Sequence, residues 1–414
     1  MFDQTTRGAD ESTLCWERLE AWAREKIQSF IQALLEEEVA TLLGRRKSER
    51  RVVVDARPGY RNGYGKPRRL SLTSGTITVR RPRLRGLEER FESRLLPFFK
   101  RRTREVGDLL PTLYLHGLAQ GDFELALRGL LGDGAPLSRS SLQRLRAKWE
   151  AEYEVWRQRA LSARELVYLW ADGLYVKAGL ERDKAAVLVV VGAMRDGSKE
   201  ILALESGVRE SAESWKVILR ALKARGLPSP RLTIADGHLG IWGGLAEIYP
   251  ESGEQRCWNH KLLNVLDQLP RREHPAARAL LCQLPYAGTQ AQCERLKRQF
   301  VERYGRAYPK AVATLERDWG RMVTFYRFPR EHWKHLRTTN VGESPFAAVR
   351  LRTDAAKRYK RVPNATALIW KTLLVAESRF RRLDAPQLLT EVYHGVTYVD
   401  GLRTSSERKR RAAA

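Results

Sequence analysis

Three acidic residues stand where the sequence could build a site for divalent cations. Asp172 follows an apolar stretch in WADGLYVK, and Asp236 follows another in LTIADGHLG. Each lies in the string Ala-Asp-Gly at the predicted end of a strand, where ligands gather in open α/β sheets. The third acid, Glu343, lies in TTNVGESPF at a predicted helix start. The structural alternative is that the aspartates are turn residues and that Glu343 belongs to a helix cap.

Three converging carboxylates suit the hydrolysis of a phosphodiester. That reaction needs an activated water, a stabilised leaving oxygen and neutralised charge, which two divalent ions roughly 3.5–4 Å apart supply together. Hard cations such as Mg²⁺ or Mn²⁺ take carboxylate oxygens as ligands. The acids Asp172, Asp236 and Glu343 are therefore predicted to be catalytic and to hold two such ions.

Cys257 and His260 form a Cys-x-x-His pair in QRCWNHK. His260 follows a strand that comes after Asp236, so it is predicted to reach the same pocket and contact the scissile phosphate. A zinc site is the alternative, but it needs two further ligands. Cys282 and Cys293 are available for it, although their spacing is not that of a zinc finger.

The elements that must position these residues begin at Glu165. Three strand-like stretches, ELVYLWADGLYVK, AAVLVVVGAMR and EILALESG, come first. A helix over 214–224, a strand over 231–235, a helix over 239–248 and a short strand over 255–258 follow. The order β-β-β-α-β-α-β predicts an α/β fold with a mixed sheet and helices on its faces. Residues 261–337 and 338–385 are predicted to be helical.

The part of the chain before residue 160 has a different character. Apolar residues at helical spacing predict a helix over 16–43 that ends at Gly44, either as a core helix or as a dimerisation helix. Residues 68–73 and 76–81 predict a basic hairpin around Ser74 and Gly75, either as a ribbon along a phosphate backbone or as a solvated hairpin without a partner. Three further helices, over 104–116, 122–131 and 138–157, resemble a helix-turn-helix.

Charge points to a polyanionic partner. The 75 Lys and Arg residues outnumber the 49 Asp and Glu residues, which gives a net charge of +26. Residues 45–104 hold 20 basic and 5 acidic side chains, so the surplus is clustered, as in proteins that bind nucleic acid. The residues predicted to contact DNA are Arg61, Lys66, Arg68, Arg69, Arg80, Arg81, Arg83, Arg139, Arg144, Lys177, Arg350, Arg352, Lys357 and Arg358.

Composition bounds the remaining possibilities. Hydrophobic residues make up 43% of the chain and charged residues 30%, which is usual for a soluble globular protein. Four cysteines in 414 residues do not make a disulfide framework. The N-terminus lacks the apolar segment of a signal peptide, and no apolar run is long enough to span a membrane. A cytoplasmic location is therefore expected.

Several strings together resemble the prokaryotic Mutator-like insertion-sequence transposases, of the Asp-Asp-Glu (DDE) type. They are WADGLYVK, IADGHLG, QRCWNHK and LRTTNVGES, preceded by GYRNGYGKPRRL, TSGTITVRRPR and LYLHGLAQGDFELALRGLLG. The resemblance implies an RNase H-like core, the triad Asp172, Asp236 and Glu343, and a helical insertion over 261–337. It also implies that the protein binds terminal inverted repeats and target DNA as a dimer or larger assembly. One departure is that Gly342 and Pro345 flank the glutamate.

The resulting expectation is a multidomain DNA transposase. An N-terminal helix and basic hairpin bind DNA over 1–102, and a helix-turn-helix-like segment spans 103–160. The RNase H-like core occupies 161–260 and 338–385, split by the insertion at 261–337, and a basic tail spans 386–414. Its activity would be hydrolytic strand cleavage followed by transfer of a 3′-hydroxyl. The alternatives are a structure-selective nuclease or resolvase on the same core, and a transposase-derived regulator that binds DNA without catalysis.

Overall fold

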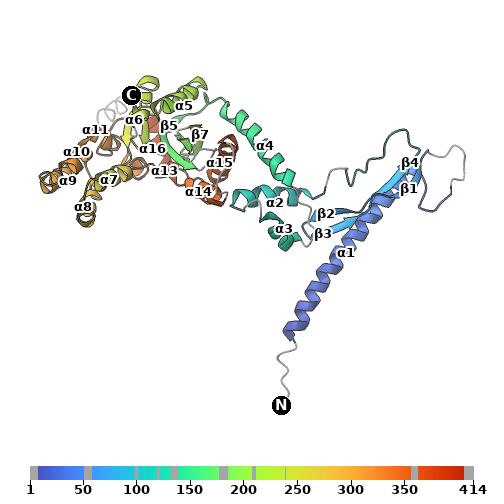
Figure 1. Ribbon diagram of the computed structural model, residues 1–414. Coiled ribbons are helices and arrows are strands. Elements are labelled where there is room, and N and C mark those ends of the chain that lie inside the picture. The colour runs from blue at the N-terminus through green and yellow to red at the C-terminus, as the bar shows by residue number, and fades with distance from the viewer. Residues whose placement is uncertain are drawn as a thin grey trace, which may run out of the picture. The chain divides into compact units, whose positions relative to one another are not determined.

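The computed structural model describes residues 8–50, 58–97, 101–118, 122–131, 139–176, 185–207, 211–237, 239–355 and 362–404. Its chain divides into two compact units, Met1–Leu145 and Arg146–Ala414 (Figure 1). Each unit has its own elements and is described separately.

The first unit is built around a long helix and two small strand pairs. The helix α1 (Gly8–Leu43) confirms the predicted helix and begins earlier than expected. The hairpin of β2 (Arg68–Leu72) and β3 (Gly75–Val79) is also confirmed, and a second antiparallel pair joins β1 (Tyr60–Tyr64) to β4 (Pro82–Arg85). Apolar side chains of α1 and the hairpin share a buried cluster that includes Leu35, Leu70 and Ile77. The predicted helices follow as α2 (Arg104–Leu115), α3 (Phe123–Leu131) and α4 (Arg139–Arg157), of which α4 continues into the second unit.

A five-stranded sheet forms the centre of the second unit. Its strands are β5 (Leu166–Val176), β6 (Ala185–Met194), β7 (Lys199–Gly207), β8 (Leu232–Ala235) and β9 (Gly253–Arg256). They lie in the order β7-β6-β5-β8-β9, with β6 antiparallel to β5 and β7, and with β8 parallel to β5 and β9. The predicted mixed sheet is confirmed. The last strand has the predicted length but begins and ends two residues earlier than predicted, since Trp258 already begins a helix.

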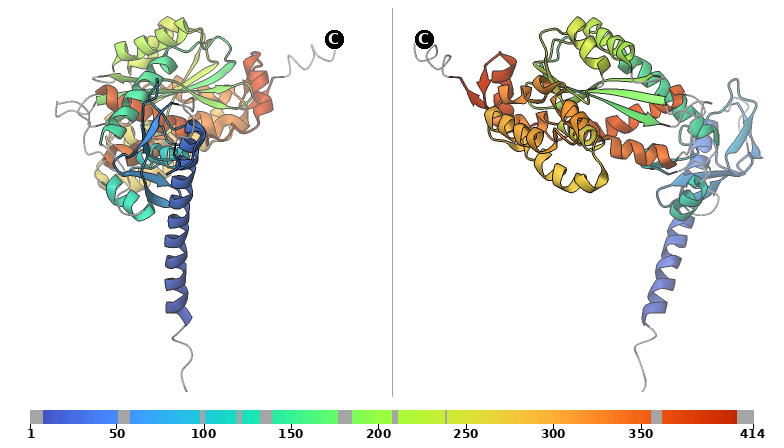
Figure 2. Two further views of the ribbon diagram at one scale, coloured as in Figure 1. Left: turned by 90° about the vertical axis from the view of Figure 1, so that its right-hand side faces the viewer. Right: turned by 60° about the vertical axis from the view of Figure 1, so that its left-hand side comes forward.

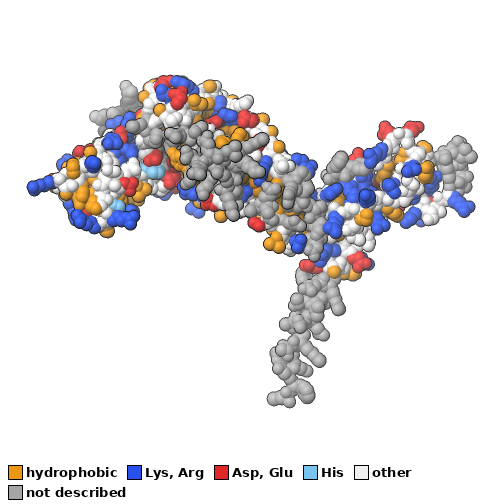
Figure 3. Space-filling view, in the orientation of Figure 1, with side chains coloured by type: hydrophobic (Ala, Val, Ile, Leu, Met, Phe, Trp, Pro, Cys, Tyr) orange, Lys and Arg blue, Asp and Glu red, His pale blue; other side chains and the backbone are white. Residues whose placement is uncertain are grey.

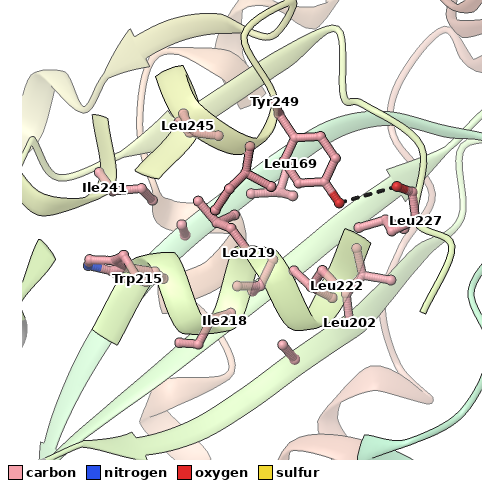
Figure 4. Packing of buried hydrophobic residues seen from close by; sticks show 14 of the residues in the cluster. Leu169, Leu202, Trp215, Ile218, Leu219, Leu222, Leu227, Ile241, Leu245 and Tyr249 are labelled. Carbon is pink, nitrogen blue, oxygen red and sulfur yellow. Dashed lines mark hydrogen bonds between the residues drawn. The ribbon is translucent and has the colours of Figure 1, made fainter. Parts of the chain in front are cut away.

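One face of the sheet is covered by α5 (Ala212–Ala224) and α6 (Leu239–Ile248). Figure 4 shows how Leu169 and Leu202 of the sheet meet Leu219 of α5 and Ile241 of α6. Each fully buried side chain of this size stabilises the fold by roughly 1.5–3 kcal/mol. Because side chains alternate along a strand, Tyr168, Trp170 and Asp172 point to the opposite face.

Helices make up most of the chain after β9, as predicted for 261–337 and 338–385 (Figure 2). The first group comprises α7 (Trp258–Leu266), α8 (His274–Leu281), α9 (Gln290–Tyr304), α10 (Pro309–Glu316), α11 (Trp319–Met322) and α12 (Trp333–Leu336), with short 3-10 turns η1 (Arg271–Glu273), η2 (Leu284–Tyr286), η3 (Thr324–Arg327) and η4 (Arg330–His332). The second group comprises α13 (Asn340–Glu343), α14 (Phe346–Ala355) and α15 (Val362–Glu377). Residues 386–404 add α16 (Pro386–Tyr393) and the pair β10 (Tyr398–Val399) and β11 (Leu402–Arg403). Within the described ranges, no helix combines the length and the apolar character that crossing a membrane requires.

Candidate active site

Asp172 lies inside β5 rather than at its end, which corrects the sequence prediction. It pairs with Val189 of β6, while the pairing of β5 with β8 stops one residue earlier, at Ala171 and Ala235. Gly173 therefore continues the strand instead of making a turn, and its N–H donates to Asp172 Oδ1 at 2.8 Å. Asp172 is only 7% exposed, and it lies one residue past the last pair that joins β5 to the parallel strand β8.

Asp236 directly follows β8, as predicted. Gly237 has a φ of +96°, a conformation that favours glycine, and a Cβ there would lie 2.2 Å from Arg256 Nε. That guanidinium donates to the backbone oxygen of Asp236 at 3.2 Å and pairs with Asp318 at 3.0 Å. The glycine thus lets a buried arginine fix the chain at Asp236.

Glu343 ends a short helix instead of starting one, so the predicted helix start is wrong. The helix is α13, and Pro345 falls in the turn before α14. The helix packs against β5, where Gly342 lies against Trp170, with 3.8 Å between an ideal Cβ and the Trp170 Cβ. This packing brings Glu343 to the face of the sheet that carries Asp172.

Cys257 and His260, at the start of α7, lie beside Asp236 and Glu343. Cys257 caps the N-terminus of α7, and His260 follows one turn later on the same face of the helix. His260 Nδ1 lies 3.3 Å from Asp236 Oδ1 and 4.0 Å from Glu343 Oε1. The predicted placement of His260 beside the acids is therefore what the structure has.

The charges of these neighbouring side chains shift the pKa values of Asp172 and His260. Burial, then the charge of Glu343, raises the pKa of Asp172 to about 7, and Asp236 adds to this effect. A hydrogen-bond contact with Cys257 and the charges of Asp236 and Asp172 raise the pKa of His260 to about 9, against burial, which lowers it. The three carboxylates thus share one site, with His260 beside Asp236 and Glu343.

Thr339 is a site residue that the sequence analysis missed. It is fully buried, and its hydroxyl donates to Glu343 Oε1. The hydroxyl oxygen lies 3.5 Å from Cys257 Sγ, and the Thr339 backbone N–H points at the same sulfur from 3.4 Å. The available signal was its position four residues before the glutamate, on the same helical face.

The cysteines do not gather into the four-ligand zinc site weighed above. Cys282 is exposed and Cys293 is buried, and both have free thiols. Among the residues that the structure describes, the possible metal ligands group as Cys257, His260 and Glu343, whose ligand atoms all lie within 4.8 Å of one another. Neither Cys282 nor Cys293 belongs to that group.

The predicted DNA-contacting residues differ in exposure. Lys66, Arg69, Arg80, Arg83, Arg144 and Arg350 are exposed, Arg61 and Arg68 are half-buried, and Arg81 and Arg352 are buried. Lys177, Lys357 and Arg358 lie outside the described residues, as does the side chain of Arg139. Figure 3 shows Lys and Arg side chains gathered over β1–β4. A cavity of about 670 Å³ there is lined by Lys66, Arg68, Arg81, Arg83, Arg85 and Arg90.

Comparison with known proteins gives consistent results. A family model described as "Transposase, Mutator family" matches residues 5–381. The transposase for insertion sequence element IS6120 of Mycolicibacterium smegmatis is 43% identical over 296 residues, which cover 72% of this chain and 92% of the relative. The transposase for IST2 of Acidithiobacillus ferrooxidans is 41% identical over 67% of this chain and 94% of its own length. The transposase for ISRM5 of Rhizobium meliloti is 31% identical over 84% and 85%.

Proposed function

The chain belongs to the Mutator family of transposases, and we propose that it cuts and rejoins DNA through a DDE triad of Asp172, Asp236 and Glu343 in an RNase H-like core. What carries the proposal is the convergence of the three acids. They come from β5, the end of β8 and the end of α13. They are nevertheless close enough that the charges of Glu343 and Asp236 raise the pKa of Asp172.

The donor set fits hard divalent cations. Three carboxylates supply oxygen ligands only, and burial together with the charge of Glu343 raises the pKa of Asp172 to about 7 despite the opposing charge of His260, so a bound cation would stabilise the ionised carboxylate. We propose that Asp172, Asp236 and Glu343 together hold two Mg²⁺ or Mn²⁺ ions. When bound, such ions activate water and stabilise the leaving oxygen of a phosphodiester.

The neighbouring residues have positioning and electrostatic roles in this proposal. Thr339 holds the Glu343 carboxylate, and Arg256 holds the backbone at Asp236. His260 lies beside both acids with a pKa raised to about 9, so in the free enzyme it is positively charged near neutral pH. A charged imidazole in that position would attract the scissile phosphate.

DNA binding is proposed for two regions. In the first unit, the basic cavity beside β1 and β4 and the exposed Arg69 and Arg80 would contact the phosphate backbone. The helices α2–α4 would act as a helix-turn-helix that reads the terminal inverted repeats. Since two element ends must be joined to one target DNA, we expect the chain to act as a dimer or larger assembly.

A strand-cleavage assay tests the proposal. Labelled duplexes that end in the inverted repeats flanking the gene are incubated with the protein and Mg²⁺ or Mn²⁺. We expect metal-dependent nicking at the repeat boundary and joined products, both lost in Asp236→Asn and Glu343→Gln. The matched control is Glu302→Gln, an exposed acid on α9, which should cut like the unchanged protein. Cleavage that persisted in Asp236→Asn would refute the triad, and nicking without joined products would indicate a nuclease.

A further inference from the structure

We propose that Cys257, His260 and Glu343 form a second metal site, for the borderline-soft cation Zn²⁺. This site overlaps the proposed triad, because both use the Glu343 carboxylate. The three ligand atoms, a sulfur, an imidazole nitrogen and a carboxylate oxygen, all lie within 4.8 Å of one another. This set differs from the all-oxygen set that suits Mg²⁺ or Mn²⁺.

Local structure explains why the ligands converge. Cys257 is the N-cap of α7, and the three-residue spacing places His260 on the same face one turn later. Glu343 arrives from α13, and its Oε1 lies 4.0 Å from His260 Nδ1. Zinc bonds of about 2.0–2.3 Å to such atoms need ligands separated by less than twice that length, so only small side-chain movements are required.

The chemistry of the ligands selects the metal. Thiolate, imidazole and carboxylate are the three ligand types that zinc uses in proteins, and three protein ligands with an open fourth position make a site that still accepts water. Sulfur is a poor ligand for Mg²⁺. Although Cys257 is fully buried, His260 and Glu343 have side chains that are 30% and 32% exposed, so the ion has an open approach.

Outer contacts to two of the ligands are already in place. The Thr339 hydroxyl donates to Glu343 Oε1, while its backbone N–H lies 3.4 Å from Cys257 Sγ. Groups of this kind orient metal ligands, and their loss typically weakens metal binding by about 10–100-fold. Thr339 would thus orient two of the three zinc ligands, Glu343 and Cys257.

The expected consequence is inhibition. A zinc ion bound to Glu343 and His260 withdraws the glutamate from the hard-cation site, so Zn²⁺ should block strand cleavage even in the presence of excess Mg²⁺. This consequence rests on the proposed function, whereas the binding itself does not.

The test uses Co²⁺ as a spectroscopic substitute for Zn²⁺ on the full-length, metal-stripped protein. We expect a sulfur-to-cobalt charge-transfer band in the near ultraviolet that saturates at about one Co²⁺ per chain and is lost when Zn²⁺ displaces the cobalt. The band should disappear in Cys257→Ser and persist in Cys282→Ser, the matched control with an exposed free thiol. Zn²⁺ affinity should fall about 100-fold or more in Cys257→Ser and at least about tenfold in Glu343→Gln.

A band that survives in Cys257→Ser, or no band in the unchanged protein, would overturn the proposal. Glu343→Gln keeps the test valid if the buried cysteine cannot be replaced without unfolding the chain, because unaltered Zn²⁺ affinity in that variant would also overturn it. Asp172→Asn separates the two proposals: it should abolish cleavage but leave the cobalt band unchanged. If the band behaves as expected while the unchanged protein never cuts DNA, the proposed function fails and the zinc site stands.

Discussion

The buried Asp172 carboxylate, when ionised, lowers the free energy of unfolding of the metal-free protein. Its pKa is raised from 3.8 to about 7, chiefly by burial and then by the charge of Glu343. We expect Asp172→Asn to raise the free energy of unfolding by roughly 1–3 kcal/mol at pH 8, since one pKa unit corresponds to about 1.4 kcal/mol. The amide oxygen can still accept the hydrogen bond from Gly173 N–H. Denaturant unfolding in EDTA measures the change.

The pH dependence of this difference has a defined sign. Between pH 4 and about 7 the folded protein holds the Asp172 proton more tightly than the unfolded chain does, so stability falls as pH rises through the folded pKa. The advantage of Asp172→Asn should therefore be largest above pH 7 and vanish near pH 4. The control is Asp318→Asn, which should destabilise the protein because that acid pairs with Arg256 and Arg321. An asparagine variant less stable than the unchanged protein at pH 8 would contradict the argument.

Thr339 permits a second prediction on single side chains. Replacing its hydroxyl in Thr339→Val keeps the shape but frees the Glu343 carboxylate, so we expect cleavage to fall about 10–100-fold. Thr339→Ser retains the hydroxyl and should recover most of the activity. Single-turnover cleavage rates at several Mn²⁺ concentrations distinguish this role from a general loss of folding, because added Mn²⁺ should partly restore the valine variant. Equal rates for valine and serine would show that the hydroxyl has no positioning role.

The sequence indicated which residues of the proposed site lie together, and it was less informative about the elements that bring them there. The repeated Ala-Asp-Gly string identified Asp172 and Asp236, but it suggested a turn after each. Only the turn after Asp236 exists. β5 continues past Asp172 because it stays paired with β6, whereas β8 ends at Ala235. The contact of Thr339 with Glu343 follows from their four-residue spacing, whereas its contact with Cys257 joins residues 82 positions apart, which no local pattern encodes.

Helix packing gives a prediction at the scale of elements. In α6, a Cβ on Gly240 would lie 2.5 Å from the Ala212 backbone of α5, whereas a Cβ on Gly243 would meet nothing within 4 Å. We expect Gly240→Ala to destabilise the protein by about 1–3 kcal/mol through overpacking. Gly243→Ala should stabilise it by about 0.5–1 kcal/mol through helix propensity.

Thermal unfolding of the two variants measures both effects on the same helix. Because α5 and α6 form the layer over the sheet, the Gly240 variant should also lose cleavage activity as the temperature rises, with the triad chemically intact. A Gly240→Ala protein as stable as Gly243→Ala would show that the two helices can separate at no cost.

Elements with strong periodicity were predictable, and short ones were not. The strands β5–β7 and the helices α5 and α6 have clear apolar patterns and lie close to their predicted bounds. The predicted strand over Gln255–Trp258 ended early because α7 begins at Trp258, with Cys257 at the N-cap position, where none of the usual capping residues Ser, Thr, Asp or Asn signals a helix start. Glu343 was expected at a helix start, yet it ends α13, and Ser344 and Pro345 form the turn before α14.

The excess of positive charge belongs to the molecule as a whole. The chain has a net charge of +26, and residues 45–104 alone hold 20 basic and 5 acidic side chains. Some of these arginines are paired inside the protein: Arg61 lies 2.5 Å from Glu36. The exposed ones on β2, β4 and the strand ends, including Lys66, Arg69 and Arg83, are available for phosphates.

We therefore expect DNA binding to depend steeply on salt. If six to ten phosphates are contacted, affinity should fall by about 10³–10⁵ between 50 and 200 mM salt, because each contact releases condensed counterions. Fluorescence anisotropy with the full-length protein and a labelled repeat-end duplex measures the slope. Replacing Lys66 and Arg83 by Gln should reduce its magnitude by about 2, roughly 1 for each lost phosphate contact. Asp172→Asn is the control, since a ligand for metal should leave the slope unchanged. A flat dependence on salt, or an unchanged slope in the double variant, would show that this basic region does not bind the phosphate backbone.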